Sequence, residues 1–297
     1  MALSRKSQDV LVRNIFFLTA LSSIVALALI MVYLFIEGLP IFKLVSVFDF
    51  LFGSFWYPTS DPPEFGILPL IVASLAVTAL SSAIAIPLGV MTAIYLAEIA
   101  SRRTRDLFKP VVELLAALPS VVIGFFGMVV VAPYIQEAFD LATGLNLFNA
   151  AVMLAFMSVP TICSVSEDAI YAVPRELKEA SLALGATHFE TIAKVVLPAS
   201  LSGISTAIML GMSRAIGETM VVLMVAGGAA MIPSSIFSPV RPMPSSIAAE
   251  MAEASFRGNH YRALFAIGIV LFLFTLVFNL VASHVAEKHK QVGAATL

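Results

Sequence analysis

The chain has 297 residues, of which 60% are hydrophobic and 12% are charged, and its net charge is −2. A mean hydropathy of +0.98 excludes an ordinary soluble domain, in which about a quarter of the residues are charged. The absence of a basic excess excludes a surface for nucleic acid. The single cysteine, Cys163, lies in an apolar run without a cysteine partner, and we interpret it as an apolar filler.

Six apolar runs are long enough to cross a bilayer, whose core of about 30 Å needs about 20 helical residues. Helices are expected because lipid offers the backbone no hydrogen-bond partner. The first run is too long for a cleavable signal and is predicted to remain as an anchor. The sequence therefore predicts an all-α integral membrane protein with spans at 12–36, 66–96, 111–134, 148–171, 200–231 and 263–286.

The basic residues predict how the chain is oriented. Six crossings put both termini on one side, and the segments on that side carry Arg5, Lys6, Arg13, Arg102, Arg103, Arg105, Lys109, Arg175, Lys178, Lys194, Lys288 and Lys290. The segments on the other side carry only Lys43, Arg241, Arg257 and Arg262. Because cytoplasmic loops are enriched in Lys and Arg, we expect both termini in the cytoplasm of a bacterium, with the chain crossing the plasma (inner) membrane several times.

Two of the outer segments are substantial, at 37–65 and 232–262. The first is rich in aromatic residues and proline and is predicted to be a packed loop at the membrane surface. In the second, Ile247, Met251 and Ala254 recur at helical spacing, which predicts a short external helix over 245–255.

The inner segment between the fourth and fifth spans predicts a helix, a turn and a second helix. Pro174 suits a first helical turn, and Gly185 suits a helix C-cap. Between them one apolar face is predicted, formed by Leu177, Ala180, Ser181 and Leu184. A second amphipathic piece over 187–196 ends at Leu197-Pro198. Such an exposed face packs either on the membrane helices of its own chain or on a partner.

This segment also carries a recognisable spacing. Glu179-Ala180-Ser181, three residues, Gly185, nine residues, Val195, one residue and Leu197-Pro198 resemble the E-A-A signature of binding-protein-dependent ABC importer permeases. Within that family, 113–127 and 214–220 resemble the permease pair of the phosphate importer, and 245–264 resembles its C subunit. The resemblance covers 66–286 well, with one departure at Gly227-Gly228, where Gly-Asn is expected.

The resemblance implies a type I ABC importer permease fold. Residues 1–65 would form the anchor helix and an external loop, 66–286 the permease core with a cytoplasmic coupling segment at 173–198, and 287–297 a cytoplasmic tail. It also implies a sister permease, two copies of an ATPase that hold ATP and Mg, an external phosphate-binding protein and surrounding membrane lipid. The residues expected to contact the ATPase are Arg175, Glu176, Leu177, Glu179, Ala180, Ser181, Leu184, Gly185 and Pro198.

Within the fifth predicted span, Arg214 and Glu218 are one helical turn apart, within reach of each other. A charge in mid-bilayer is costly, so the two must face protein or a water-filled path. One interpretation is an ion pair that fixes helix packing. The other is a phosphate path in which Arg214 binds the anion and Glu218 holds the arginine, with Ser213 and Thr219 beside them.

Pro87 in the second span and Pro119 and Gly124 in the third interrupt regular helix. They are candidates for hinges or gates, although glycine and proline also serve close packing in membrane helices. Glu113 and the pair Glu167-Asp168 either line the inner mouth of a path or are solvated helix ends.

The chain contains no Gly-Lys pair and hence no Walker loop, so we expect any ATP hydrolysis on a separate chain and no cofactor here. The histidines lack partners at ligand spacing, and no metal site is expected. The alternatives to a phosphate permease are a permease for another oxyanion such as sulfate or molybdate, a proton-coupled secondary transporter using Glu218, and an integral-membrane enzyme, for which no catalytic cluster is found.

Overall fold

A computed structural model of the chain describes residues 5–290 and shows a bundle of long helices. The strands in this range are β1 (Trp56–Tyr57) and β2 (Glu64–Phe65), which form an antiparallel hairpin, and an isolated bridge joins Gly227 and Val240. Six helices are long and apolar enough to span a membrane, and they cover Val12–Lys43, Leu68–Ile99, Ser120–Ala138, Leu147–Tyr171, His188–Ile216 and Asn259–Val281. The prediction of an all-α membrane protein with six spans is confirmed. The predicted tail at 287–297 lies outside the described residues from 291 onward.

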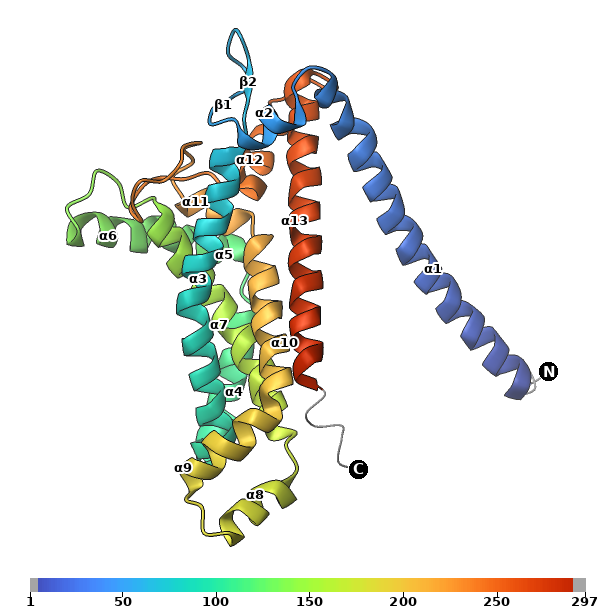
Figure 1. Ribbon diagram of the computed structural model, residues 1–297, viewed down its shortest axis with the longest axis vertical. Helices are drawn as coiled ribbons and strands as arrows, with labels where there is room; N and C mark the ends of the chain where they lie inside the picture. The colour runs from blue at the N-terminus through green and yellow to red at the C-terminus, as the bar shows by residue number, and fades with distance from the viewer. Residues whose placement is uncertain (1–4, 291–297) are drawn as a thin grey trace.

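Four spans follow their predicted ranges closely. They are α1 (Arg5–Gly38), α3 (Leu68–Ile94) with the π-helical turn Tyr95–Ile99, α7 (Leu147–Tyr171) and α13 (Asn259–Lys290). The described ends of the chain lie at the same end of the molecule as α8 (Arg175–Ala183) and α9 (His188–Thr191) (Figure 1).

The third span begins later than predicted. Residues 102–116 form a separate helix, α4 (Arg102–Ala116), and the span itself consists of α5 (Ser120–Phe126), the π-helical turn Gly127–Val131 and α6 (Ala132–Ala138). The chain breaks before α5 because Pro119 adopts an extended conformation, with φ −61° and ψ 136°. The apolar residues from Val111 to Ala116 belong to an amphipathic helix at the inner end of the bundle. Their hydropathy therefore led to a predicted span that starts too early.

The fifth span also differs from the prediction. Its helix runs without interruption from α9 through the π-helical turn Ile192–Val196 into α10 (Leu197–Ile216), and therefore begins at His188, about three helical turns before Ser200. It ends at Ile216, and a short helix, α11 (Met220–Val225), follows after a break. The prediction of a continuous helix to Met231 is wrong, because Gly217 to Thr219 leave the helical path.

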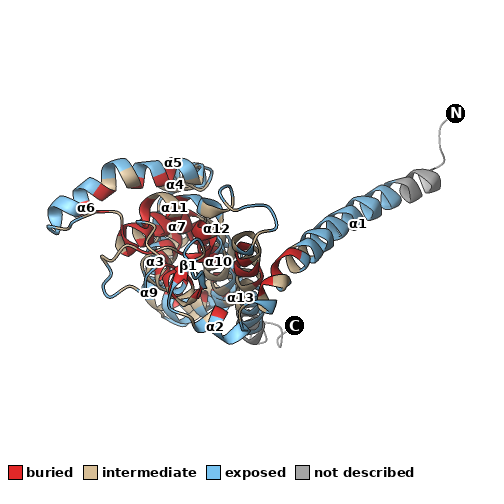
Figure 2. Cartoon of the chain, turned by 90° about the horizontal axis from the view of Figure 1, so that it is seen from above, coloured by how far each residue is buried: buried red, intermediate tan, exposed pale blue. Residues whose placement is uncertain are grey.

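The centre of the bundle is α7, which packs against α3 on one side and α10 on the other. Figure 2 shows the buried residues gathered in this middle region. Two glycines make the approach of the helices possible, because a Cβ at Gly89 would lie 2.8 Å from Ile162 Cβ and one at Gly211 would lie 2.5 Å from Ile162 Cγ1. Ile162 therefore occupies the space that small residues on α3 and α10 leave open.

Helix α1 leans away from the bundle and approaches it near the outer end of α13 (Figure 1). There the Tyr33 and Tyr261 hydroxyls are 3.2 Å apart, and Arg257 Nη2 lies 3.2 Å from the buried Glu37 Oε1. Most of the apolar side chains of α1 are exposed, so this surface is available to lipid or to another membrane protein.

The outer segments form a cap over the bundle. It contains the 3₁₀ turn Leu39–Lys43, α2 (Val47–Phe52), the hairpin and α12 (Met243–Glu250). The predicted external helix is present, although it begins two residues earlier and ends five residues earlier than 245–255. Met243 N donates a hydrogen bond of 2.9 Å to Ser74 Oγ, which ties the start of α12 to α3.

The packing around Ile162 can be tested by substitution. Gly211→Ala is expected to lower the free energy of unfolding by about 1–3 kcal/mol, because a methyl group added to a filled core forces its neighbours to move. Thermal unfolding of the purified chain in detergent measures the effect. The combination with Ile162→Ala should cost less than the sum of the two single changes, since it vacates the space that the new methyl group needs.

The matched control is Gly217→Ala, whose Cβ would meet only Ser213 O at 3.9 Å. If Gly211→Ala is as stable as this control, the close approach of α7 and α10 does not depend on that glycine.

Candidate functional site

The inner segment after α7 folds as a helix, a turn and a second helix. Helix α8 follows Pro174, and it stops at a left-handed Gly185 with φ +87°. The Gly185 and Ala186 amides donate to the Leu182 and Ser181 carbonyls at 2.9 and 3.2 Å. This is the Schellman pattern of a glycine-terminated helix, so the predicted stop at Gly185 is confirmed.

The second helix has a capping box at its start. Glu190 N donates to Thr187 Oγ1 at 3.2 Å, and Thr187 N donates to Glu190 Oε2 at 3.0 Å. The two helices are joined by the Ser181 and Thr191 hydroxyls, which lie 2.9 Å apart. Ser181 replaces the second alanine of the E-A-A signature, and its hydroxyl has a partner instead of entering an apolar contact.

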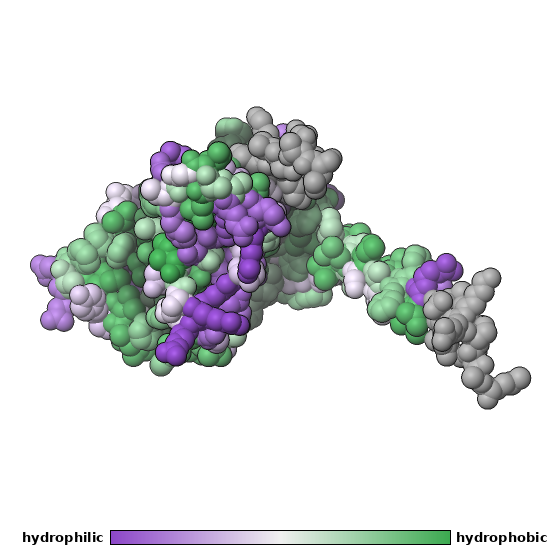
Figure 3. Space-filling view, turned by 90° about the horizontal axis from the view of Figure 1, so that it is seen from below, coloured by the Kyte–Doolittle hydropathy of each residue, from purple (hydrophilic) through white to green (hydrophobic). Residues whose placement is uncertain are grey.

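Apolar side chains around the turn between the two helices are exposed and do not pack on the bundle. Leu184 is 90% exposed and Phe189 is 78% exposed, and α8 contains no buried residue. Arg175, Glu176 and Glu179 are exposed beside them. Figure 3 shows the molecule from this end, with hydrophilic and apolar residues side by side on the surface. Exposed Leu and Phe side chains amid charges are typical of a protein-binding surface.

A group of charges fixes α4 to the inner end of α7. Glu167 is 1% exposed; its Oε1 accepts a hydrogen bond from Arg105 Nε at 2.9 Å, and its Oε2 forms an ion pair with Lys109 Nζ at 3.4 Å. Lys109 also pairs with Asp168 at 3.0 Å, and Arg105 lies over the Tyr171 ring. Burial alone lowers the pKa of Lys109, but its bond to Asp168 and the charge of Glu167 outweigh burial and raise that pKa above its ordinary value. Glu167 is therefore an interhelical anchor, whereas Asp168 and Glu113 are exposed, as the interpretation of solvated helix ends expects.

The predicted ion pair between Arg214 and Glu218 is absent among the described residues. Because α10 ends at Ile216, Glu218 is not part of the helix and does not lie on the same helical face as Arg214. The spacing of four residues therefore does not bring the two side chains together. Glu218 Oε1 instead accepts from Met220 N at 3.2 Å and Val221 N at 3.4 Å, so its carboxylate caps α11. Arg214 is exposed and has no ion pair within the described part of the chain.

The other two candidates of the path lie close to this break. Ser213 Oγ donates to Asn279 Oδ1 of α13 at 2.7 Å, and Thr219 Oγ1 donates to Gly217 O at 3.3 Å. The structure thus brings Ser213, Arg214, Glu218 and Thr219 together where α10 gives way to α11, at mid-height of α13 (Figure 1). Arg214 provides the unpaired positive charge of this group.

The three hinge candidates lie apart from one another. Pro87 is inside α3, and Pro119 separates α4 from α5. Gly124 faces α11, where an added Cβ would lie 2.9 Å from Met224 Sδ and 3.2 Å from Val221 Cα. Close helix packing accounts for Gly124, while the broken chain at Pro119 is the stronger candidate for a hinge.

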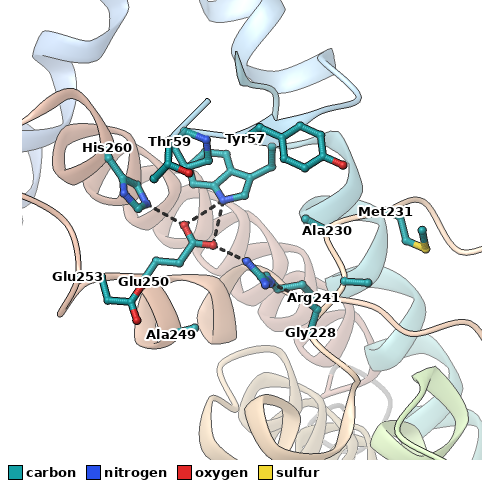
Figure 4. A pocket seen from close by; sticks show the side chains of 13 residues that line it. Tyr57, Thr59, Gly228, Ala230, Met231, Arg241, Ala249, Glu250, Glu253 and His260 are labelled. Carbon is teal, nitrogen blue, oxygen red and sulfur yellow. Dashed lines mark hydrogen bonds and ion pairs between the residues drawn. The ribbon is translucent and has the colours of Figure 1, made fainter. Parts of the chain in front are cut away.

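A cavity of about 620 Å³ opens on the outer face. Figure 4 shows Glu250 of α12 at its centre, where the carboxylate accepts hydrogen bonds from three side chains. Trp56 Nε1 lies 3.1 Å from both carboxylate oxygens, His260 Nε2 lies 2.8 Å from Oε2, and Arg241 Nη1 pairs with Oε1. The carboxylate therefore joins β1, α12, α13 and the loop after α11.

Sequence reasoning did not find this cavity. Trp56 and Glu250 are 194 positions apart, and no local spacing connects them. Glu253 also lines the cavity, so two carboxylates face one arginine. A cavity with more carboxylates than arginines does not attract a free anion.

Comparisons with known proteins identify the family to which the chain belongs. The family model described as binding-protein-dependent transport system inner membrane component matches residues 85–291. The probable ABC transporter permease protein YqgH of Bacillus subtilis is 37% identical over 97% of this chain and 94% of its own length. The phosphate transport system permease protein PstC of Pasteurella multocida is 37% identical over 77% of both chains.

Solved structures show the same fold. The chain is similar to a bacterial alginate ABC transporter crystallised with an alginate-bound periplasmic protein, with a TM-score of 0.67 at 16% identity over 99% of this chain and 100% of that one. It is also similar to the inward-facing MetNI methionine ABC transporter, with a TM-score of 0.59 at 19% identity over 73% of this chain and 93% of that one. The architecture is that of type I ABC importer permeases, and the chain belongs to the family of binding-protein-dependent transport system inner membrane components.

Proposed function

We propose that this chain is one of two membrane-spanning subunits of an ATP-driven importer of inorganic phosphate, and that it is the C-type subunit of the pair. The relatives named phosphate transport system permease protein support the solute, with 37% and 35% identity over 77% and 80% of this chain. The observation that carries the mechanism is the exposed, unpacked helix pair of α8 and α9.

Members of this family work with a partner permease, an ATPase and a binding protein. We propose that two copies of the ATPase hold ATP and Mg and that one of them covers α8, with Leu184 and Phe189 in its groove. The binding protein delivers phosphate at the outer face. The chain supplies a conduit, and ATP hydrolysis takes place on the separate subunit.

The proposed orientation places both termini and α8 in the cytoplasm. The excess of Lys and Arg in the inner segments supports it, and the described ends of the chain lie at the same end as α8 (Figure 1). In this orientation, nucleotide-driven movement enters at α8, and solute enters at the opposite end.

Within the proposed path, Arg214 binds the passing phosphate. Its guanidinium is exposed at a break in the fifth span and has no carboxylate partner among the described residues, so it is free to form paired hydrogen bonds with phosphate oxygens. Glu218 does not hold the arginine, as the sequence had led us to expect. It holds the start of α11 in place and leaves the arginine unneutralised.

The function is tested with the complex of both permeases and the ATPase in liposomes that enclose ATP, with phosphate-loaded binding protein outside. Radioactive phosphate should accumulate only when ATP and the binding protein are both present, and dissipation of the proton gradient should not prevent it. Uptake of sulfate or molybdate in place of phosphate would assign another oxyanion. Uptake that needs a proton gradient and no ATPase would support a secondary transporter.

Gly185→Val tests the role of the helix pair. A β-branched residue is strongly disfavoured at positive φ, so the stop after α8 should be lost, ATPase binding should fall, and phosphate uptake should be abolished while the protein stays in the membrane. Co-purification of the ATPase and uptake are the measurements. Gly185→Asn is the control, since asparagine tolerates this conformation; wild-type uptake by the valine variant would remove the docking argument.

Arg214→Ala should lower phosphate uptake by roughly tenfold or more, because hydrogen bonds to charged groups contribute about 1.5–3 kcal/mol. Arg214→Lys should be intermediate, since it keeps the charge and loses the paired geometry. Normal uptake by the alanine variant would exclude this residue from the path.

The absence of an ion pair is tested separately. In thermal unfolding, Arg214→Ala and Glu218→Ala should be additive within about 0.5 kcal/mol. A larger interaction energy would show that the two side chains are paired after all.

A further inference from the structure

Helix α8 is held to the membrane bundle by few contacts, although it lies where movement of the ATPase would enter. None of its residues is buried. Through the chain it follows Val173, which is buried in an apolar cluster with Leu96, Ile170 and Val196. Apart from that connection, its polar side-chain links to other elements among the described residues are the hydrogen bond between the Ser181 and Thr191 hydroxyls and an ion pair between Lys178 Nζ and Glu98 Oε1.

The ion pair joins α8 itself to the end of α3, which Val173 reaches only from outside α8, through the apolar cluster that contains Leu96. Val173 continues α7, and Thr191 precedes α10, whereas Glu98 lies in the π-helical turn Tyr95–Ile99 that ends α3. Such turns are often found at functional sites, because the extra residue per turn redirects side chains. Lys178 is therefore the side chain that connects α8 to α3.

The pair is also sheltered from solvent. The Glu98 side chain is 8% exposed and that of Lys178 is 23% exposed, so their attraction is screened less than that of a surface pair. The pair of Glu190 and Lys194 provides a contrast within the same segment. Its side chains are 43% and 73% exposed, and it joins two residues of one helix, where ion pairs contribute little.

Helix α3 continues from this link to the outer cap. Near its outer end Ser74 Oγ accepts a hydrogen bond from Met243 N at the start of α12, and α12 carries Glu250 of the outer cavity. From Ser74 to Glu98 the helix extends about 36 Å at 1.5 Å per residue. One continuous helical element thus connects the surface that faces the ATPase with the segments around the outer opening.

We propose that the ion pair of Lys178 and Glu98 fastens α8 to α3 and that transport depends on this link, with Lys178 and Glu98 as positioning residues. The inference rests on the proposed function, since it assumes that α8 receives movement from an ATPase. Without the pair, α8 still binds the ATPase through its exposed apolar side chains, but its displacement no longer moves α3. Hydrolysis and solute movement then become uncoupled.

The test uses Lys178→Glu, Glu98→Lys and the exchange of both residues, each in the complete complex in liposomes with the binding protein. The measurements are co-purification of the ATPase, ATP hydrolysed, and phosphate imported per ATP. Each single change should keep the ATPase bound and lower the phosphate imported per ATP by about tenfold, a change within the range of coupling between sites. The exchange variant should recover most of the loss, because it restores the opposite charges.

Two further variants keep the result interpretable. Lys194→Glu is the matched control and should leave the phosphate imported per ATP unchanged. Glu98→Gln preserves the shape of the side chain and should show the same loss as the charge reversals even if Glu98→Lys fails to fold. The proposal is overturned if Glu98→Gln and Lys178→Glu import phosphate per ATP like the wild type, or if the exchange variant folds and recovers nothing. A wild-type complex that imports no phosphate contradicts the proposed function instead, and the ratio is then measured with the solute that is imported.

Discussion

Inside hydrocarbon, every backbone N–H and C=O must be hydrogen-bonded by protein, and the rest of this structure depends on that constraint. It accounts for the long helices, and it also limits where a helix can break. At the break after α10, the carboxylate of Glu218 accepts from the amides of Met220 and Val221. At the π-helical turn of the third span, the buried Asn149 donates from Nδ2 to Gly127 O at 3.2 Å and to Gly144 O at 3.0 Å. Side chains thus replace the bonds that irregular backbone gives up.

The same constraint determines where charge is found. A charge that faces lipid is costly, so the ionised groups of the chain are concentrated at the two ends of the bundle and at the break beside Arg214. At the inner end they are paired between different helices, as in Arg105 with Glu167 and Lys178 with Glu98. Removing one partner of such a sheltered pair leaves an uncompensated charge. These pairs therefore fix how α4, α7, α8 and α3 are placed relative to one another, which is the geometry that a coupling surface requires.

Much of the fold could be predicted from hydropathy and spacing. Length and composition were sufficient for α1, α3, α7 and α13, and Pro174 and Gly185 were sufficient for the bounds of α8. The errors have a common cause: an apolar run reports burial or lipid contact without reporting where the helix breaks. Val111 to Ala116 are apolar on one face of a surface helix, and Gly217 ends a helix that hydropathy extends to Met231. The pairing of Arg214 with Glu218 failed for the same reason, because it assumed an unbroken helix.

The candidate site was predictable only where it is local in sequence. The E-A-A spacing identified the helix pair, but Glu98 lies 80 positions from Lys178 and Trp56 lies 194 positions from Glu250, and only the folded chain brings these partners together. The distribution of these charges has a consequence for selectivity. Two carboxylates, Glu250 and Glu253, and one arginine line the outer cavity, so this cavity does not concentrate phosphate from free solution, whereas Arg214 has no ion pair within the described part of the chain. On the path that we propose, an anion passes an acidic opening before it reaches Arg214, which favours delivery at the opening by a carrier. A permease built in this way leaves the choice of solute to its binding protein and the direction of transport to its ATPase.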